Sequence, residues 1–433
     1  MRVSSLMMTG NYLQQLNNAY AKEAKLMEQT DGSSLHRPSD NPVNYTKNLI
    51  YTTSLTENDQ YQANVNTAVS WMKSTDSAMV NMSDAMTTIA EKTVAAANDK
   101  NATDPAAIGT EVTKLIQEVV SQGNSQIGGR YLFSGQMDST QPFTLSTNKV
   151  DRGLAKTLDD TQSAFFNDTA KVGNLSQMLS MTGSDGNSYY LNTETGNVYT
   201  SDFVNSGYKD VKNKTGHGDT VAAGDQVGNI AVPTTPAGFA AKYFNPKDGS
   251  LLTTPQTALS ASGTSVTFTF DTIQQQVVTY NGDNNRLSMV KQNGAINTSI
   301  DSVNVTGQDM FGSKDIFGSS AGTATLNDLL TVAAKMNAND SKWLSSDGIT
   351  LSNNAHTSMV DSEASLAART TVYNDASTTL DTQKTLITTD ITNVSATDVS
   401  ALAVKLMTAQ TLYNMSLSVG SKILPKSLAD YLS

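Results

Sequence analysis

The feature that most constrains this 433-residue chain is a helical pattern of more than fifty residues, from about 43 to 98. Apolar side chains recur in it at intervals of seven, which is typical of a helix that packs on other helices along its length. At 1.5 Å per residue such a helix is about 80 Å long, so no small globule can cover it. The pattern therefore predicts helical partners running alongside. The two interleaved rows are Val65, Met72, Met79 and Met86, and Ala68, Thr75, Met82, Ile89 and Ala96.

Both ends of the chain carry the same kind of pattern. A helix is expected from about Val3 to Gln29, another from about 354 to 394, and a last one with Ser395 as N-cap and Asp398 as capping-box acid. We expect the first and last helices to pack antiparallel, with the longer inner helices paired beneath them. The heptad rows are Leu6, Leu13, Tyr20 and Met27 with Leu16; Leu366, Tyr373, Leu380, Ile387 and Val394; and Val399, Leu402, Leu406, Ala409, Tyr413, Gly420 and Ile423.

Short signals indicate how the long helices begin. Asn41 is expected as the N-cap and Pro42 as the first residue of the long helix. A third helix is expected to start after Asp104 at Pro105. Its predicted apolar face is Ile108, Val112, Leu115, Ile116 and Val119.

Glycine separates a turn-rich middle from ends that favour helix. Twenty of the 28 glycines lie between residues 141 and 350, and only Gly420 lies beyond 350. At "GGRYLFSG", residues 128–135, we expect the two glycines to end a helix and "RYLF" to begin a strand. The other expected elements of the middle are a strand with Val266, Phe268 and Phe270 on one face, a hairpin around Thr195-Gly196, a strand running into a hairpin turn at 281–285, and an amphipathic helix, "TATLNDLLTVAAKM".

These patterns predict a mainly α fold with an inserted β domain, of the α+β class. A long antiparallel coiled-coil or helical-bundle rod is expected from both termini, with the β-rich middle domain at its far end. The expected division is a terminal coiled-coil assembly domain of residues 1–40 with 396–433, a helical-bundle rod domain of 41–140 with 346–395, and a β-rich outer domain of 141–345.

The composition argues against catalysis and against several ligand classes. The chain has no cysteine, and its three histidines, His36, His217 and His356, have no second histidine at helical metal-ligand spacing. No phosphate-binding loop is present, and residues 281–285 lack the closing glutamate of a calcium loop. With a net charge of −11, nucleic acid is not an expected partner. We therefore expect no enzyme activity, no cofactor and no metal, and we interpret the methionine row as interhelical core rather than a binding face.

The N-terminal stretch lacks a continuous apolar segment, so no cleaved secretory signal is expected, and no stretch has the length of a membrane span. What remains is surface. Isolated helices with such thin apolar seams are marginal in water, which favours packing among several copies. The predicted assembly interface is Leu6, Leu13, Leu16, Tyr20, Met27, Val399, Leu402, Leu406, Ala409, Tyr413 and Ile423.

Three short motifs resemble those of the flagellin superfamily. "SSLHRPSDNP" is similar to the turn between that superfamily's outer and inner helices, although Leu35-His36-Arg37 stands where the usual form has a basic residue, an aliphatic residue and Asn before Pro-Ser-Asp. "GGRYLFSG", followed by "TQPF" up to Phe143, resembles the hook–filament junction proteins of the superfamily, as does "KSLADYL" at the tail. The matching residues are Arg37, Pro38, Ser39, Asp40, Pro42, Arg130, Tyr131, Leu132, Phe133, Ser134, Gly135, Ser427, Leu428, Tyr431 and Leu432.

The resemblance implies a structural, non-catalytic part of the bacterial flagellum that connects the hook to the filament. It implies assembly with further copies, contact with the first hook-associated protein and with flagellin, and a chaperone on the C-terminal helix. It also implies type III export to the extracellular flagellum. The alternatives are the flagellin filament subunit itself and a secreted adhesin-like protein on a flagellin-like scaffold. A non-flagellar type III tip or phage tail protein is a weaker option.

Overall fold

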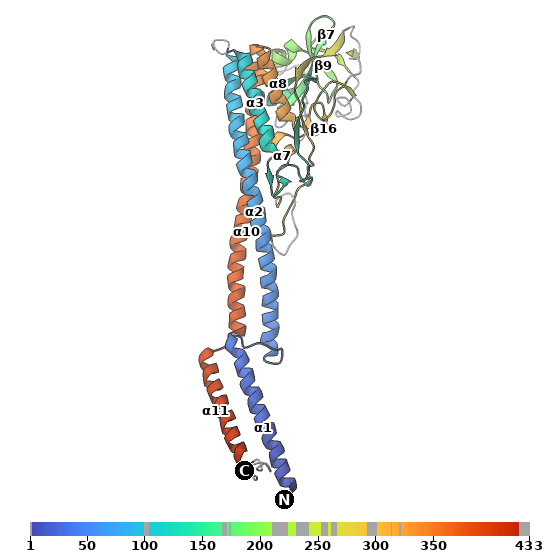
Figure 1. Cartoon of the computed structure of the whole chain (residues 1–433). Coiled ribbons are helices and arrows are strands. Elements are labelled where there is room, and N and C mark those ends of the chain that lie inside the picture. Colours follow the sequence, from blue (N-terminus) through green and yellow to red (C-terminus); the bar gives the residue numbers. More distant parts are fainter. Residues whose placement is uncertain are drawn as a thin grey trace. The chain divides into compact units, whose positions relative to one another are not determined.

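The computed structural model describes residues 2–98, 104–166, 171–172, 175–209, 224–230, 242–252, 259–260, 266–291, 301–312, 314–319 and 322–423. The chain divides into two compact units, Met1–Asn64 with Ala376–Ser433 and Val65–Asp375. The fold is mainly α with a β-rich insertion, as the sequence predicted (Figure 1). The finer division into three domains stays a prediction.

The long helices lie close to their predicted positions. The side chain of Asn41 accepts a hydrogen bond from the Asn44 amide at 3.1 Å, and Pro42 is the first helical residue, so this N-cap is confirmed. The long helices are α1 (Arg2–Glu28), α2 (Pro42–Ala97), α3 (Pro105–Gly123), α8 (Ala324–Asn337), α10 (Ile349–Ser395) and α11 (Val399–Ile423). The short helical turns are η1 (Gln29–Asp31), α4 (Asp160–Phe166), η2 (Phe203–Gly207), α7 (Gly307–Phe311), α9 (Ser341–Trp343) and η3 (Leu344–Gly348).

In the first unit, α1 packs antiparallel on α11 (Figure 1). The Tyr12 hydroxyl donates to the Ser416 carbonyl at 3.0 Å, and the rings of Tyr20 and Tyr413 lie 6.1 Å apart. The unit also holds the paired lower turns of α2 and α10, where the Asn58 side chain donates to the Leu380 carbonyl at 3.2 Å. The predicted antiparallel pairing of outer helices and of inner helices is therefore confirmed within this unit.

The start of α11 differs from the prediction. Asp398, not Ser395, is the N-cap, because its carboxylate accepts from the Ala401 amide at 3.0 Å. Ser395 is the last residue of α10, and its hydroxyl already donates to the Ile391 carbonyl at 2.6 Å. A serine hydroxyl committed to the preceding helix does not cap the next one.

In the second unit, the upper part of α2 packs against α10 (Figure 1). The predicted rows of α2 are buried, and so are Leu366 and Tyr373 on α10. Met72, Met79 and Met82 have no accessible surface, which confirms that the methionine row is interhelical core. The predicted face of α3 is buried too, except for the half-buried Leu115.

Helix α8 lies where a helix was expected, but it is buried on nearly every side, so the prediction that it is amphipathic was wrong. It lies between α3 and the strand β13. Gly109 of α3 lies close to the Ala333 carbonyl of α8, and the Gln275 side chain of β13 donates to the Asn327 carbonyl of α8 at 3.0 Å. Several polar side chains of α8 hydrogen-bond to the surrounding strands rather than to water. Asp328, for example, pairs with the buried Arg152 at 3.2 Å.

The β-rich part contains one large antiparallel sheet and several two-stranded ones. The large sheet has the order β10-β9-β8-β7-β12-β11, with β5 and β6 also pairing β7; the small sheets are β1-β2, β13-β4, β14-β3 and β15-β16. The strands are β1 (Gln126–Ile127), β2 (Arg130–Tyr131), β3 (Phe143–Leu145), β4 (Val150–Gly153), β5 (Ala155–Leu158), β6 (Lys171–Val172), β7 (Leu175–Gly183), β8 (Ser188–Leu191), β9 (Asn197–Thr200), β10 (Gln226–Asn229), β11 (Leu259–Ser260), β12 (Thr267–Phe270), β13 (Thr272–Gln275), β14 (Val278–Tyr280), β15 (Lys314–Asp315) and β16 (Gly318–Ser319).

Two predictions for the large sheet are confirmed. Gly196, with φ of 76°, lies in the turn between β8 and β9, which form the expected hairpin. Phe268 and Phe270 are buried in the core of the sheet, and Val266 packs against the same core.

Two turns differ from the prediction. Helix α3 ends at Gly123, and Gly128 and Gly129, with φ of 57° and 80°, instead form the turn of the β1-β2 hairpin. The strand after them is only Arg130–Tyr131. Residues 281–285 form no hairpin either, because the Asp283 carboxylate accepts from the Gln136 amide at 2.7 Å and so binds another part of the chain.

Candidate functional site

The surface of α1 and α11, which we call the terminal pair, is the strongest candidate site. These two helices bury few of their large apolar side chains against each other. Exposed apolar groups in such number on one pair of helices make this pair a candidate interaction surface. Each of the following is between 44% and 69% exposed: Met7, Met8, Leu13, Tyr20, Met27, Val399, Val404, Met407, Leu412, Met415, Leu417 and Val419.

The contact between the two helices is narrow. Leu402 and Ala409 are buried on α11, and Gly420 lies so close to α1 that a Cβ there would overlap the Tyr12 hydroxyl. A small residue at position 420 therefore allows this close approach. Leu16, Leu406 and Tyr413 are half-buried.

The predicted interface residues divide into two groups. Leu16, Leu402, Leu406, Ala409 and Tyr413 lie toward the contact within the chain. Leu13, Tyr20, Met27 and Val399 are largely exposed, so the heptad row of α1 contributes little to its seam with α11 beyond the contact between the rings of Tyr20 and Tyr413. The side chains of Leu6 and Ile423, and the whole of Ser427, Leu428, Tyr431 and Leu432, lie outside the described residues. Periodicity identifies an apolar stripe, but it does not identify what covers that stripe.

The turn between α1 and α2 is organised by Asp40. One carboxylate oxygen accepts from the amides of His36 and Arg37, at 3.2 and 2.9 Å, and the other pairs with Lys25 at 2.6 Å. The hydrogen bond from Lys25 lowers the pKa of Asp40, and the two amide bonds lower it further, against the opposing effect of burial. Arg37 also pairs with Glu28 at 2.6 Å. The sequence motif here is therefore a structural turn.

The same turn is tied to the connection between α10 and α11. The Ser34 amide donates to the Ser395 carbonyl at 2.6 Å, and the Thr397 amide donates to the Gly32 carbonyl at 3.1 Å. Both connections of the first unit are thus joined by backbone hydrogen bonds. Arg37 and Ser39 remain exposed beside them.

The second motif, residues 128–143, packs on β14, on the residues that follow it and on α7. Phe143 is fully buried, with its ring 5.3 Å from that of Tyr280 and 5.4 Å from that of Phe311. The Tyr280 hydroxyl lies 2.8 Å from the Phe133 carbonyl, and burial raises the pKa of Tyr280. Leu132, Phe133 and Ser134 are buried, whereas Arg130 is exposed and pairs with Asp138 at 3.1 Å. This motif is therefore core rather than contact surface.

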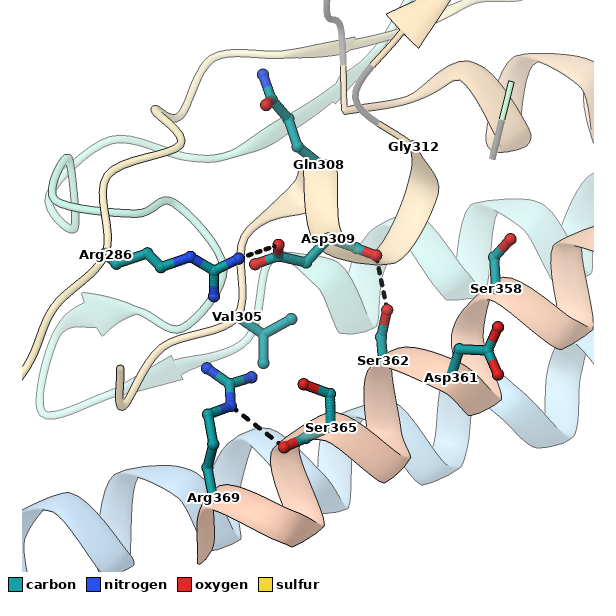
Figure 2. A pocket seen from close by; sticks show the side chains of 10 residues that line it. All are labelled: Arg286, Val305, Gln308, Asp309, Gly312, Ser358, Asp361, Ser362, Ser365 and Arg369. Carbon is teal, nitrogen blue, oxygen red and sulfur yellow. Dashed lines mark hydrogen bonds and ion pairs between the residues drawn. The ribbon is translucent and has the colours of Figure 1, made fainter. Parts of the chain in front are cut away.

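A polar pocket of about 340 Å³ lies beside α10 and has no counterpart among the sequence predictions (Figure 2). Arg286 pairs there with Asp309 at 2.8 Å, and the Ser362 hydroxyl donates to the Asp309 carbonyl at 2.6 Å. Burial lowers the pKa of Arg369, whose guanidinium Nε donates to the Ser365 carbonyl at 3.2 Å. The other residues around the pocket are Val305, Gln308, Gly312, Ser358 and Asp361.

The described residues hold no group of three His, Asp or Glu side chains placed to bind a metal ion. His36 is exposed with its Nε2 3.1 Å from the Ser33 carbonyl, His356 is half-buried, and His217 lies outside the described residues. No described helix has the length and apolar character needed to cross a membrane.

Comparison with known proteins connects the N-terminal part of the chain to a family. A family model described as the bacterial flagellin N-terminal helical region matches residues 3–138. Flagellar hook-associated protein 3 of Salmonella typhimurium is 27% identical over 167 residues, which cover 38% of this chain and 53% of the relative. The protein of the same name in Escherichia coli is 27% identical over 152 residues, which cover 34% and 48%. These matches confirm the resemblance to the flagellin superfamily, and the chain spans about half the length of the curated relatives it matches.

Solved structures of flagellar junction proteins are similar to this chain at lower sequence identity. FlgL of Xanthomonas campestris is 16% identical with a TM-score of 0.35, covering 79% of this chain and 99% of that one. The flagellar junction protein of Legionella pneumophila is 14% identical with a TM-score of 0.31, covering 75% and 98%. TM-scores this low do not establish a shared arrangement.

Proposed function

We propose that this chain is a structural, non-catalytic component of the bacterial flagellum that connects the hook to the flagellin filament. The exposed apolar surface of the terminal pair carries the proposal. Twelve large apolar side chains exposed on two helices are expected to be covered by other subunits. A head-to-tail contact repeated by rotation and rise continues a helical lattice, and such contacts need no reactive groups.

The relatives support this assignment. Two curated proteins that match the chain carry the name flagellar hook-associated protein 3, and the family model covers the flagellin N-terminal helical region. We therefore infer that the partners are further copies of this chain, the first hook-associated protein on the hook side and flagellin on the filament side. Before assembly, an export chaperone would cover the exposed apolar side chains of α11. Export would place the protein in the extracellular flagellum.

The exposed and buried residues of the predicted interface have different roles in this proposal. Leu13, Tyr20, Met27 and Val399 would contact neighbouring subunits, because their side chains are between 47% and 69% exposed in the single chain. Leu402 and Ala409 would hold α11 to α1 within one subunit. The same apolar surface would serve a filament subunit, and the names of the relatives favour the junction instead.

Deleting the gene tests the proposal. Cells without this chain are expected to carry bare hooks and to release flagellin monomers, because filament subunits are made but have nothing on which to grow. Electron microscopy of the cells and an assay for flagellin in the medium measure both effects. Bare hooks with no flagellin in the medium would identify the chain as the filament subunit instead. Normal filaments would contradict a flagellar role.

A further inference from the structure

The pocket beside α10 in Figure 2 has the features of a peptide site. We propose that it is a groove for an extended polar segment of a neighbouring subunit, with a carboxylate at the Arg369 end and a cationic group at the Asp361 end. This inference rests on the proposed function only in taking the segment from a neighbouring subunit.

The positive charge at the Arg369 end of the groove has no ion-pair partner among the described residues, although Asp309 acts on it at longer range. The guanidinium of Arg369 is buried, and its hydrogen bonds go to neutral oxygens: the carbonyls of Ser302, Asn304 and Ser365 and the Ser302 hydroxyl. Among the described residues no carboxylate lies within ion-pair distance of it. Residues 292–300, 313 and 320–321, which adjoin the pocket-lining segments in the sequence but are not among the described residues, contain no Asp or Glu.

The nearest ion pair offsets this charge only in part. Asp309 is already paired with Arg286, and the Arg286 charge disfavours the charged form of Arg369 while the Asp309 carboxylate favours it. A buried guanidinium without a carboxylate is a strong attractor for one, because charge-assisted hydrogen bonds are roughly twice as strong as neutral ones.

The opposite end of the groove has unused acceptor and donor groups. Asp361 is exposed on the rim, and none of the ion pairs of the described residues includes it. The Ser358 hydroxyl is buried and has no hydrogen-bond partner in the described structure. A buried polar group without a partner costs free energy, and an occupant that hydrogen-bonds to Ser358 would remove that cost.

The spacing of the lining residues favours an extended peptide over a small ion. Ser358, Ser362, Ser365 and Arg369 follow one face of α10 over eleven residues, or about 16 Å. An extended chain covers this length with about five residues. From Asp361 to Arg369 is about 12 Å, which matches an acidic and a basic side chain three or four positions apart. Val305 is the only large apolar residue in the lining, so the occupant is polar.

The absence of cysteine from the chain allows a direct test with single introduced thiols. In the full chain, Ser358→Cys places a thiol in the groove, and Thr357→Cys places one on an exposed position of the same helix outside it. The probe is the peptide acetyl-Glu-Ser-Thr-Lys-Ser-amide, and the readout is the rate of alkylation by iodoacetamide. Its matched control carries Gln in place of Glu, and succinate tests for a simple anion site.

The proposal predicts that saturating probe slows alkylation at position 358 by about tenfold and leaves position 357 unchanged. The Gln peptide should bind about three- to tenfold more weakly than the Glu peptide. The Glu peptide should lose a similar factor on an Asp361→Asn variant and should bind a Glu363→Gln variant as it binds the parent chain. Protection by neither peptide, equal protection by both, or equal protection by succinate would overturn the proposal.

A second arm tests the source of the occupant. In isolated flagella, the thiol of the Ser358→Cys variant should be protected, and that of the Thr357→Cys variant should react as in the free chain. Equal reactivity of the thiol at position 358 in the free and assembled states would show that no neighbouring subunit fills the groove. Because the peptide arm uses the free chain, its failure leaves the junction assignment untouched, and the deletion phenotype tests that assignment separately.

Discussion

At the residue scale, two glycines with similar backbone conformations occupy different surroundings. Gly129 and Gly135 both have positive φ, at 80° and 72°. A Cβ at Gly129 would meet open space, whereas one at Gly135 would overlap the carboxylate and backbone of Asp283. The sequence motif "GGRYLFSG" contains both, yet only Gly135 has to let the 281–285 segment approach.

We therefore expect Gly135→Ala to destabilise the second unit more than Gly129→Ala. Each substitution costs about 1 to 2 kcal/mol for a left-handed alanine, and only Gly135→Ala adds a steric overlap, worth about 1 to 3 kcal/mol more. Denaturant unfolding of both variants measures the difference. Equal losses would contradict the close packing of Asp283 on Gly135.

Asp40 gives a pH-dependent prediction. Because Lys25 and two backbone amides lower its pKa, its carboxylate stabilises the turn above the ordinary pKa of an unfolded aspartate, about 4, and this contribution is lost as the pH falls through the lower folded value. Asp40→Asn should therefore be less stable than the wild type at neutral pH, and the gap should shrink as the pH falls below the ordinary aspartate pKa of about 4.

Thermal unfolding followed by circular dichroism across this pH range measures the gap. The partner variant Lys25→Met and the double variant complete a cycle that isolates the ion pair. A gap that stays constant with pH would mean that the Asp40 carboxylate does not organise the turn.

At the element scale, the periodic positions of the long helices were predictable because burial repeats with the helical turn. The α2 rows and the cap at Asn41 needed nothing beyond local sequence. The character of α8 was not predictable, since Asn327, Asp328 and Thr331 look like a solvated face until their partners on β4, β13 and β14 are known. The prediction of Ser395 as the N-cap of α11 was wrong for a similar reason, because its hydroxyl could bond to either α10 or α11 and bonds to α10.

The packing of α2 against α10 predicts that truncating two adjacent residues of α2 has very different effects on stability. Met79 has no accessible surface, whereas Val80 is 38% exposed. Met79→Ala should cost about 2 to 5 kcal/mol of unfolding free energy, because it leaves a cavity between two packed helices. Val80→Ala should cost less than about 1 kcal/mol. Denaturant unfolding compares them, and similar losses would argue against this packing.

At the scale of the whole molecule, the motifs and the heptad ends indicated the class of protein, but not which stripe of the terminal pair faces outward. Leu13, Tyr20 and Met27 share one heptad row, and a heptad row is equally suited to a partner within the chain or outside it. In the structure, α11 packs on the stripe of α1 that contains Tyr12 and Leu16. The polar pocket had no signal in the sequence, because its residues come from three separate segments.

The most direct test of assembly through the terminal pair is complementation of the deletion strain with Leu13→Glu and with Met407→Glu. Both residues are exposed, so each variant should keep the circular dichroism and unfolding transition of the wild type. Leu13→Met and Met407→Leu retain the apolar surface and serve as controls. Electron microscopy should show bare hooks with the charged variants and full filaments with the controls. Full filaments with both charged variants would contradict the account.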